Sequence, residues 1–208
     1  MLNRLLQEFY ESPNNGRQII GLKNGRRLVL GHSEVAGPCM ITLQVSTDMK
    51  PKRTEKDFSD GLQLVGENAA IRNANAPGFG GCVLLTPDDT LHLAWSSEDG
   101  IYNSSAPVDE ALVSTAWNEA ERVAEGDVWL GDFLLHRRQP LAIFRRSNAS
   151  KEEEIGLSRY IEGTWTTTGL WDSGPLYPPV GHIDEENTLH LAWSDVPGRL
   201  WYGAVNER

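Results

Sequence analysis

The chain has 208 residues, of which 39% are hydrophobic and 23% charged, which excludes a disordered or fibrous protein and allows a substantial core. A net charge of −10 opposes nucleic acid or an anionic membrane surface as the main partner. No apolar stretch is long enough to span a membrane, and the first residues lack the apolar run of a signal peptide. We therefore expect no membrane association and, by default, a cytoplasmic location.

The first element is a short segment, residues 3–11, with four large apolar or aromatic side chains ahead of the first repeated unit. Two interpretations stay open for it. The segment forms either an edge strand or a short amphipathic helix over residues 2–9.

Two units of similar pattern follow this segment. The first, residues 17–65, contains the run Leu28–Ser33 after a Lys-Asn-Gly turn and the alternating run Met40–Val45. The second, residues 79–122, contains the heptapeptide TLHLAWS at Thr90–Ser96 after an acidic turn. Short alternating runs between turns are typical of β-strands.

Two further units complete the chain. The third, residues 127–172, has the run Gln139–Phe144 at the corresponding place. The fourth, residues 178–208, repeats TLHLAWS without change at Thr188–Ser194. Identity of this length indicates an internal repeat, with a unit of about 40 to 50 residues.

A repeat of this length with four strands per unit predicts an all-β fold, a β-propeller of about four four-stranded blades. The fourth unit ends before its last strand, so we expect residues 3–11 to supply that strand and to close the ring. A larger ring, in which another chain or further sequence adds blades, is an open alternative.

The pattern resembles the sialidase-like propellers, also called BNR or Asp-box repeat proteins, in which a strand leads into Ser-x-Asp-x-Gly-x-Thr-Trp. Residues 158–165 keep the Ser, Gly, Thr and Trp of this box, with Tyr160 at the Asp position. Residues 45–48 begin another box, in which residues 50–52 replace the glycine. The resemblance implies a site made of a tyrosine nucleophile, carboxylates and arginines that grip a carboxylate group.

The loops between second and third strands and the connections between blades share one face of a propeller, around its axial opening. Arginine binds carboxylates in a bidentate way, and a neutral tyrosine is a suitable nucleophile for an anionic sugar. The candidate catalytic residues on this face are Tyr177, Glu34 and Asp99. The candidate ligand-binding residues are Arg17, Arg72, Arg145 and Arg199.

Two histidines, His92 and His190, occupy the same place in the two copies of the heptapeptide. Equivalent strands of opposite blades cannot meet, so the two cannot share a metal, and we expect structural contacts to a neighbouring blade or carbonyl. Trp95 and Trp193 are expected in the core between blades. Cys39 and Cys82 lack the spacing of metal ligands and are expected to be free thiols.

These observations favour a non-catalytic propeller that binds a glycan or a protein on its axial face, with no cofactor and no metal. An exo-acting glycoside hydrolase of sialidase type is the alternative, so the sequence leaves the question of catalysis open. The opposite charges of successive strand-to-strand turns also allow a homo-oligomer or a larger assembly.

Overall fold

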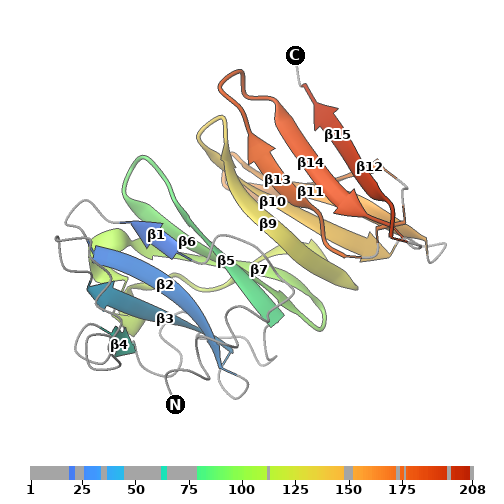
Figure 1. Ribbon diagram of the computed structural model, residues 1–208. Helices are drawn as coiled ribbons and strands as arrows, with labels where there is room; N and C mark the ends of the chain where they lie inside the picture. Colours follow the sequence, from blue (N-terminus) through green and yellow to red (C-terminus); the bar gives the residue numbers. More distant parts are fainter. Residues whose placement is uncertain are drawn as a thin grey trace, which may run out of the picture.

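The described part of the chain is all-β and forms four consecutive antiparallel sheets (Figure 1). The computed structural model describes residues 19–21, 26–33, 37–44, 62–64, 79–111, 113–147, 152–171, 174–175, 177–195 and 198–206. The expected strand segment at residues 3–11 lies outside these residues. No helix in the described ranges is long and apolar enough to cross a membrane.

Each sheet is formed by strands that follow one another in the chain, so neighbouring strands are joined by local connections. The first sheet contains β1 (Ile19–Gly21), β2 (Arg26–Ser33), β3 (Gly37–Gln44) and β4 (Leu62–Leu64). The second contains β5 (Phe79–Leu85), β6 (Thr90–Ser97), β7 (Gly100–Pro107) and β8 (Glu121–Glu125). The third contains β9 (Val128–His136), β10 (Gln139–Ser147), β11 (Glu153–Ile161) and β12 (Thr164–Trp171). The fourth contains β13 (Val180–Ile183), β14 (Leu189–Ser194) and β15 (Leu200–Val205).

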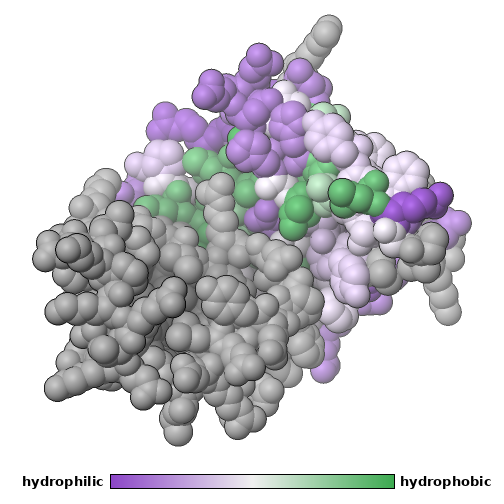
Figure 2. Space-filling view, in the orientation of Figure 1, coloured by the Kyte–Doolittle hydropathy of each residue, from purple (hydrophilic) through white to green (hydrophobic). Residues whose placement is uncertain are grey.

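The first strands of successive sheets are neighbours in space: β1 lies next to β5, β5 next to β9, and β9 next to β13. The sheets therefore stack face against face in chain order, from the blue β1–β4 to the red β13–β15 in Figure 1. In the same view, Figure 2 shows hydrophobic residues near the middle of the described surface and hydrophilic residues crowding its upper part.

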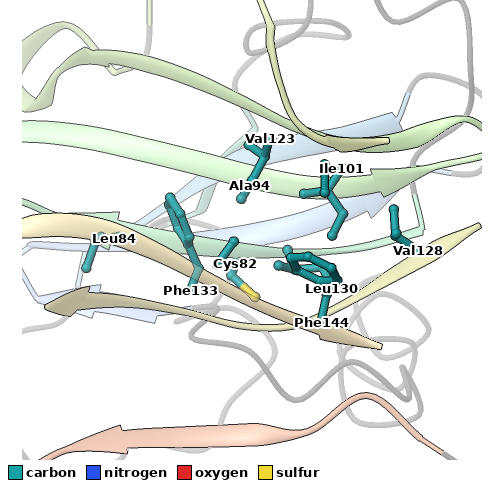
Figure 3. Packing of buried hydrophobic residues seen from close by; sticks show 11 residues of the cluster. Cys82, Leu84, Ala94, Ile101, Val123, Val128, Leu130, Phe133 and Phe144 are labelled. Carbon is teal, nitrogen blue, oxygen red and sulfur yellow. The ribbon is translucent and has the colours of Figure 1, made fainter. Parts of the chain in front are cut away.

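The core between the second and third sheets follows from strand alternation. Ala94 of β6 points toward the third sheet, whereas Leu93 and Trp95, its neighbours in sequence, point the other way into a separate cluster. Figure 3 shows the core between the second and third sheets, where Phe133 and Phe144 of the third sheet lie against side chains of the second. Both phenylalanine rings have an exposed fraction of 0%.

A second core joins the third and fourth sheets. Leu189, Leu191 and Trp193 of the repeated heptapeptide pack there against side chains of β9, β10 and β11. Trp95 and Trp193 are both buried, which confirms the sequence prediction for these two residues.

Buried polar groups also join the sheets. The Leu130 amide donates a hydrogen bond to Ser96 Oγ at 2.8 Å, and Ser158 Oγ donates to the Val123 carbonyl at 2.7 Å. Asp132 accepts from the Gly181 amide at 3.1 Å. These bonds fix the registry of neighbouring sheets, because a buried donor that loses its partner is costly.

Cys82 is a free, buried thiol, as the sequence predicts. Burial, and then the charge of Asp132, raises the pKa of this thiol well above its ordinary value, so it stays protonated and unreactive. The Cys39 side chain lies outside the described part of the chain.

Trp117 lies between the short 3-10 helix Ser114–Ala116 and β8, where its indole donates to the Ala111 carbonyl at 3.0 Å. It therefore closes the end of the core cluster around Trp95.

Candidate functional site

Three arginines lie at one end of the last three sheets, each with a carboxylate and an aromatic ring of its own sheet. This end carries the β6–β7, β10–β11 and β14–β15 connections. We call it the arginine edge, and define it by Arg122, Arg145 and Arg199 with their partners.

In the second sheet, Asp99 and Tyr102 surround Arg122. The Tyr102 hydroxyl donates to both Asp99 oxygens, at 3.0 and 2.9 Å, and Arg122 Nη2 donates to Asp99 at 3.0 Å. The guanidinium carbon also lies 5.6 Å from the centre of the Tyr102 ring. Tyr102 in turn stacks on the buried Trp95, which holds the cluster in place.

In the third sheet, Arg145 pairs with Glu153, with Nε 3.2 Å from the carboxylate. Its guanidinium carbon lies 5.4 Å from the centre of the Trp129 ring, which is 39% exposed. Arg146, the next residue, pairs with Glu154. Two adjacent ion pairs thus cross from β10 to β11.

In the fourth sheet, Asp195 is buried and accepts four hydrogen bonds. Arg199 donates from Nε at 3.0 Å, from Nη2 at 2.8 Å and from its backbone amide at 2.9 Å, and the Trp201 indole donates at 2.7 Å. The guanidinium carbon of Arg199 also lies 5.4 Å from the centre of the Trp201 ring. The side chain of Trp201 keeps 42% exposure.

The hydrogen bonds from Arg199, and to a smaller extent that from Trp201, hold the pKa of Asp195 below its ordinary value. A carboxyl whose pKa is lowered is ionised at neutral pH. It cannot act as the general acid that glycoside hydrolysis needs. Asp195 is therefore an anchor for Arg199 and Trp201.

Tyr177 is 57% exposed and lies in the connection between β12 and β13. Three contacts fix this connection across the arginine edge. The Gly174 amide donates to the Glu153 carbonyl at 3.0 Å, Pro175 forms a β-bridge with Asp195, and Pro178 and Pro179 pass directly over Gly131. The connection thus contacts the anchors of both Arg145 and Arg199.

Four candidates from the sequence, Tyr177, Asp99, Arg145 and Arg199, lie at this end of the sheets. Asp99 is bound by Arg122, and Arg145 and Arg199 each bind a carboxylate of their own sheet. Glu34, Arg17 and Arg72 lie outside the described residues, so their roles stay predictions.

Sequence reasoning missed the aromatic members of the edge. Tyr102 lies opposite Trp95 across the strand pair, and Trp201 lies opposite Trp193. Both therefore take the same place in the two copies of the repeat. Alignment by cross-strand partners would have found them.

The described residues contain no group of three or more His, Cys, Asp or Glu side chains that could hold a metal ion.

Solved structures resemble the chain in fold. A protein of unknown function from Dyadobacter fermentans is 13% identical, with a TM-score of 0.62 over 92% of this chain and 52% of its own. The catalytic domain of a GH62 α-L-arabinofuranosidase from Coprinopsis cinerea is 12% identical, with a TM-score of 0.55 over 92% and 64%. An α-L-arabinofuranosidase from Clostridium thermocellum is 10% identical, with a TM-score of 0.54 over 96% and 72%.

The two arabinofuranosidases are propeller proteins, so the similarity shows a propeller-type all-β fold. The chain spans about half the length of the Dyadobacter protein and about two thirds of the GH62 domain. No protein-family model and no curated protein matches the sequence. The narrower resemblance to sialidase-like propellers stays a prediction.

Proposed function

We propose that the chain is a non-catalytic, glycan-binding propeller module whose binding surface is the arginine edge. The observation that carries the proposal is the repeated set of an arginine, a carboxylate and an aromatic ring in three successive sheets. The apolar face of a sugar ring packs on aromatic rings, and its hydroxyls exchange hydrogen bonds with guanidinium and carboxylate groups. The propeller arabinofuranosidase of Podospora anserina, solved with cellotriose, is similar in fold, with a TM-score of 0.50.

Preorganisation supports this function. Each arginine is held by its carboxylate before a ligand arrives, which reduces the loss of side-chain entropy on binding. Trp129, Trp201 and Tyr177 are 39%, 42% and 57% exposed, so a sugar ring can contact the exposed parts of these side chains.

A binding assay tests the proposal. We expect the parent chain to bind at least one of a panel of neutral and sialylated oligosaccharides, cellotriose and sialyllactose among them, in calorimetric titration. Trp201→Ala and Trp129→Ala should each weaken that binding by about tenfold or more, as loss of a central aromatic contact does. Ile161→Ala, which changes a 47% exposed residue at the opposite end of the third sheet, should leave it unchanged.

Absence of binding across the panel, or equal losses in Ile161→Ala and the tryptophan variants, would rule out the arginine edge as a glycan site. Capture of a protein instead of a glycan would favour the protein-binding form of the hypothesis.

The alternative, an exo-acting glycosidase of sialidase type, predicts turnover of a fluorogenic sialoside between pH 4 and 8. Its residues would be Tyr177 as nucleophile, with Glu34 and Asp99 as carboxylates, and Arg17, Arg72, Arg145 and Arg199 on the substrate. Turnover that disappears in Tyr177→Phe and Arg145→Ala would replace the binding proposal. The lowered pKa of Asp195 weighs against a general acid at that position.

The ring itself is also a proposal. We take each sheet as one blade, over residues 17–65, 79–122, 127–172 and 178–208, although β8 extends to Glu125. The described fourth sheet has three strands where the others have four, which supports the addition of residues 3–11 to the free edge of β15. Deletion of residues 1–12 should then accelerate amide hydrogen exchange along β15, and unchanged exchange there would reject this closure.

A further inference from the structure

Two of the three sets at the arginine edge share one interface, the junction between the third and fourth sheets. In the third sheet, Trp129 and Ile155 both lie directly opposite Arg145, one on β9 and the other on β11. Residues directly opposite each other point to the same face of a sheet, and Ile155 belongs to the core that joins the third and fourth sheets. Arg145 and Trp129 therefore lie on the face of the third sheet that packs against the fourth.

The fourth sheet directs its own set toward the same junction. Trp201 lies opposite Trp193, which is buried in this core. Asp195 accepts hydrogen bonds from both Trp201 and Arg199. We call the two sets together the junction site, defined by Trp129, Arg145, Glu153, Asp195, Arg199 and Trp201.

The chain crosses from one set to the other. The Gly174 amide donates to the Glu153 carbonyl at 3.0 Å, and Pro175 forms its β-bridge with Asp195. Tyr177, which is 57% exposed, follows in the same connection. The two halves of the junction site are therefore tied together by the backbone, next to an accessible aromatic ring.

Closure of the ring by residues 3–11 would leave this site accessible. In the second sheet, β8 lies beside β7, yet Tyr102, at the place of Trp201, remains partly exposed. A strand added to the free edge of β15 would take the position of β8, so part of Trp201 would stay exposed. Trp129 and Tyr177 do not belong to that edge.

Both arginines of the junction site are paired with carboxylates that are themselves held in place. Asp195 is 4% exposed and accepts Nε, Nη2 and the backbone amide of Arg199. Glu153 lies 3.2 Å from Arg145 Nε and also accepts the Ser147 hydroxyl at 2.8 Å. An acidic sugar would have to displace one of these carboxylates, which would then lose its compensating charge.

Negative charge is in excess among the described residues of the site. Asp127 adds a third carboxylate, which accepts a hydrogen bond from the Trp129 indole at 3.3 Å. Uncharged sugar hydroxyls avoid repulsion by these groups, and they can donate to carboxylate oxygens. They can also accept from Arg199, whose side chain is 66% exposed.

We propose that the junction site binds an uncharged oligosaccharide and discriminates against sialic and uronic acids. The proposal rests on the glycan-binding function proposed above and narrows it to one ligand class and one junction. Sugar rings contact Trp129 on one side and Trp201 on the other, so the bound ligand holds the third and fourth sheets together.

Matched ligand pairs test the ligand class. The full chain is titrated calorimetrically with cellotriose and its C6-oxidised uronic form, and with lactose and sialyllactose. We expect the uncharged member of at least one pair to bind at least about tenfold more tightly than the acidic member, because like charges brought together at a binding site are strongly unfavourable. Its Kd should change by less than about twofold between about 20 and 500 mM NaCl, since no ion pair with the ligand forms.

A charge variant tests the cause of this discrimination. Glu153→Gln removes one carboxylate at nearly constant size, so it should strengthen binding of the acidic members. Glu162→Gln makes the same chemical change at an exposed residue of the β11–β12 turn and should have no effect. Equal or tighter binding of the acidic members by the parent chain would overturn the ligand class and leave the glycan-binding function intact. Absence of binding by every member of the pairs and of the wider panel would reject both.

Hydrogen exchange tests the position of the ligand. Exchange of the β14 amides requires the fourth sheet to open, and a ligand held by both sheets opposes this opening. Saturating ligand should therefore slow exchange in β14 and at Gly174 by about tenfold or more, while β6 keeps its rate. Unchanged exchange in β14 with the ligand bound would overturn the junction site, although the chain would still be a glycan-binding protein.

Discussion

Phe144→Ala is expected to destabilise the protein by about 3 to 5 kcal/mol, the usual cost of removing a buried phenylalanine ring. The ring has no exposed surface and lies between the second and third sheets, where Leu130 is a member of the same core cluster (Figure 3). In a domain of this size each kcal/mol lowers Tm by about 2 to 4 °C, so Tm should fall by about 6 to 20 °C. Urea unfolding measures the free energy directly.

A double-mutant cycle identifies the cause of this loss. Gly156 faces Phe144, and a Cβ at this glycine would meet the phenylalanine ring. Gly156→Ala should therefore be destabilising in the parent chain and much less so in Phe144→Ala, where the added methyl group fills part of the space. Ile161→Ala, on an exposed position, should change stability by at most about 0.5 kcal/mol. A Gly156→Ala cost that is equal in both backgrounds would contradict this packing.

Gly131→Ala is expected to disrupt the connection that carries Tyr177. A Cβ at residue 131 would fall against the carbonyl oxygen of Pro179, with Pro178 Cβ at 3.0 Å. The Pro179 carbonyl belongs to the backbone and the Pro178 Cβ to a rigid ring, so neither can turn aside as a flexible side chain does. We expect a loss of about 1 to 3 kcal/mol from overpacking, together with weaker glycan binding.

The amide of Gly174 reports this displacement, because it donates to the Glu153 carbonyl at 3.0 Å in the same connection. Its hydrogen exchange should accelerate in Gly131→Ala. Gly169→Ala is the matched control, since its Cβ would meet side-chain ends, those of Arg146 and Glu154 at 3.2 Å, and no backbone atom. If both variants keep the parent exchange rate at Gly174, the connection is not held by its contact with β9.

The repeated heptapeptide explains how much of the fold could be predicted. Its alternation places Leu91, Leu93 and Trp95 on one face of a strand, and it does the same for the second copy, so both strands and their buried faces follow from the sequence. The antiparallel sheets follow from the short turns between such runs. Alternation does not predict which sheet packs against which face of its neighbour, because that packing depends on contacts between units.

The candidate site shows the limit more sharply. Arg145 and Arg199 could be chosen from the sequence because loops of a propeller gather on one face. The carboxylates that bind these arginines could not be chosen in this way, because Glu153 meets Arg145 only through the pairing of β10 with β11. His190 was expected to contact a neighbouring blade or a carbonyl, whereas it binds Asp184 and Tyr202 of its own sheet. Cross-strand register decides such partners, and composition does not reveal it.

The stacking of sheets that are each formed by consecutive strands also affects the order in which the molecule unfolds. The third sheet takes part in two described apolar interfaces, one with the second sheet and one with the fourth, so its loss would open both at once. Sheet β13–β15 takes part in one described interface, through Leu189, Leu191 and Trp193. Compared with unfolding that starts at the third sheet, unfolding that starts at sheet β13–β15 opens fewer described interfaces and has a lower free-energy cost. Separation of this sheet would break the bridge between Pro175 and Asp195, so the arginine edge would lose its organisation before the central sheets lose theirs.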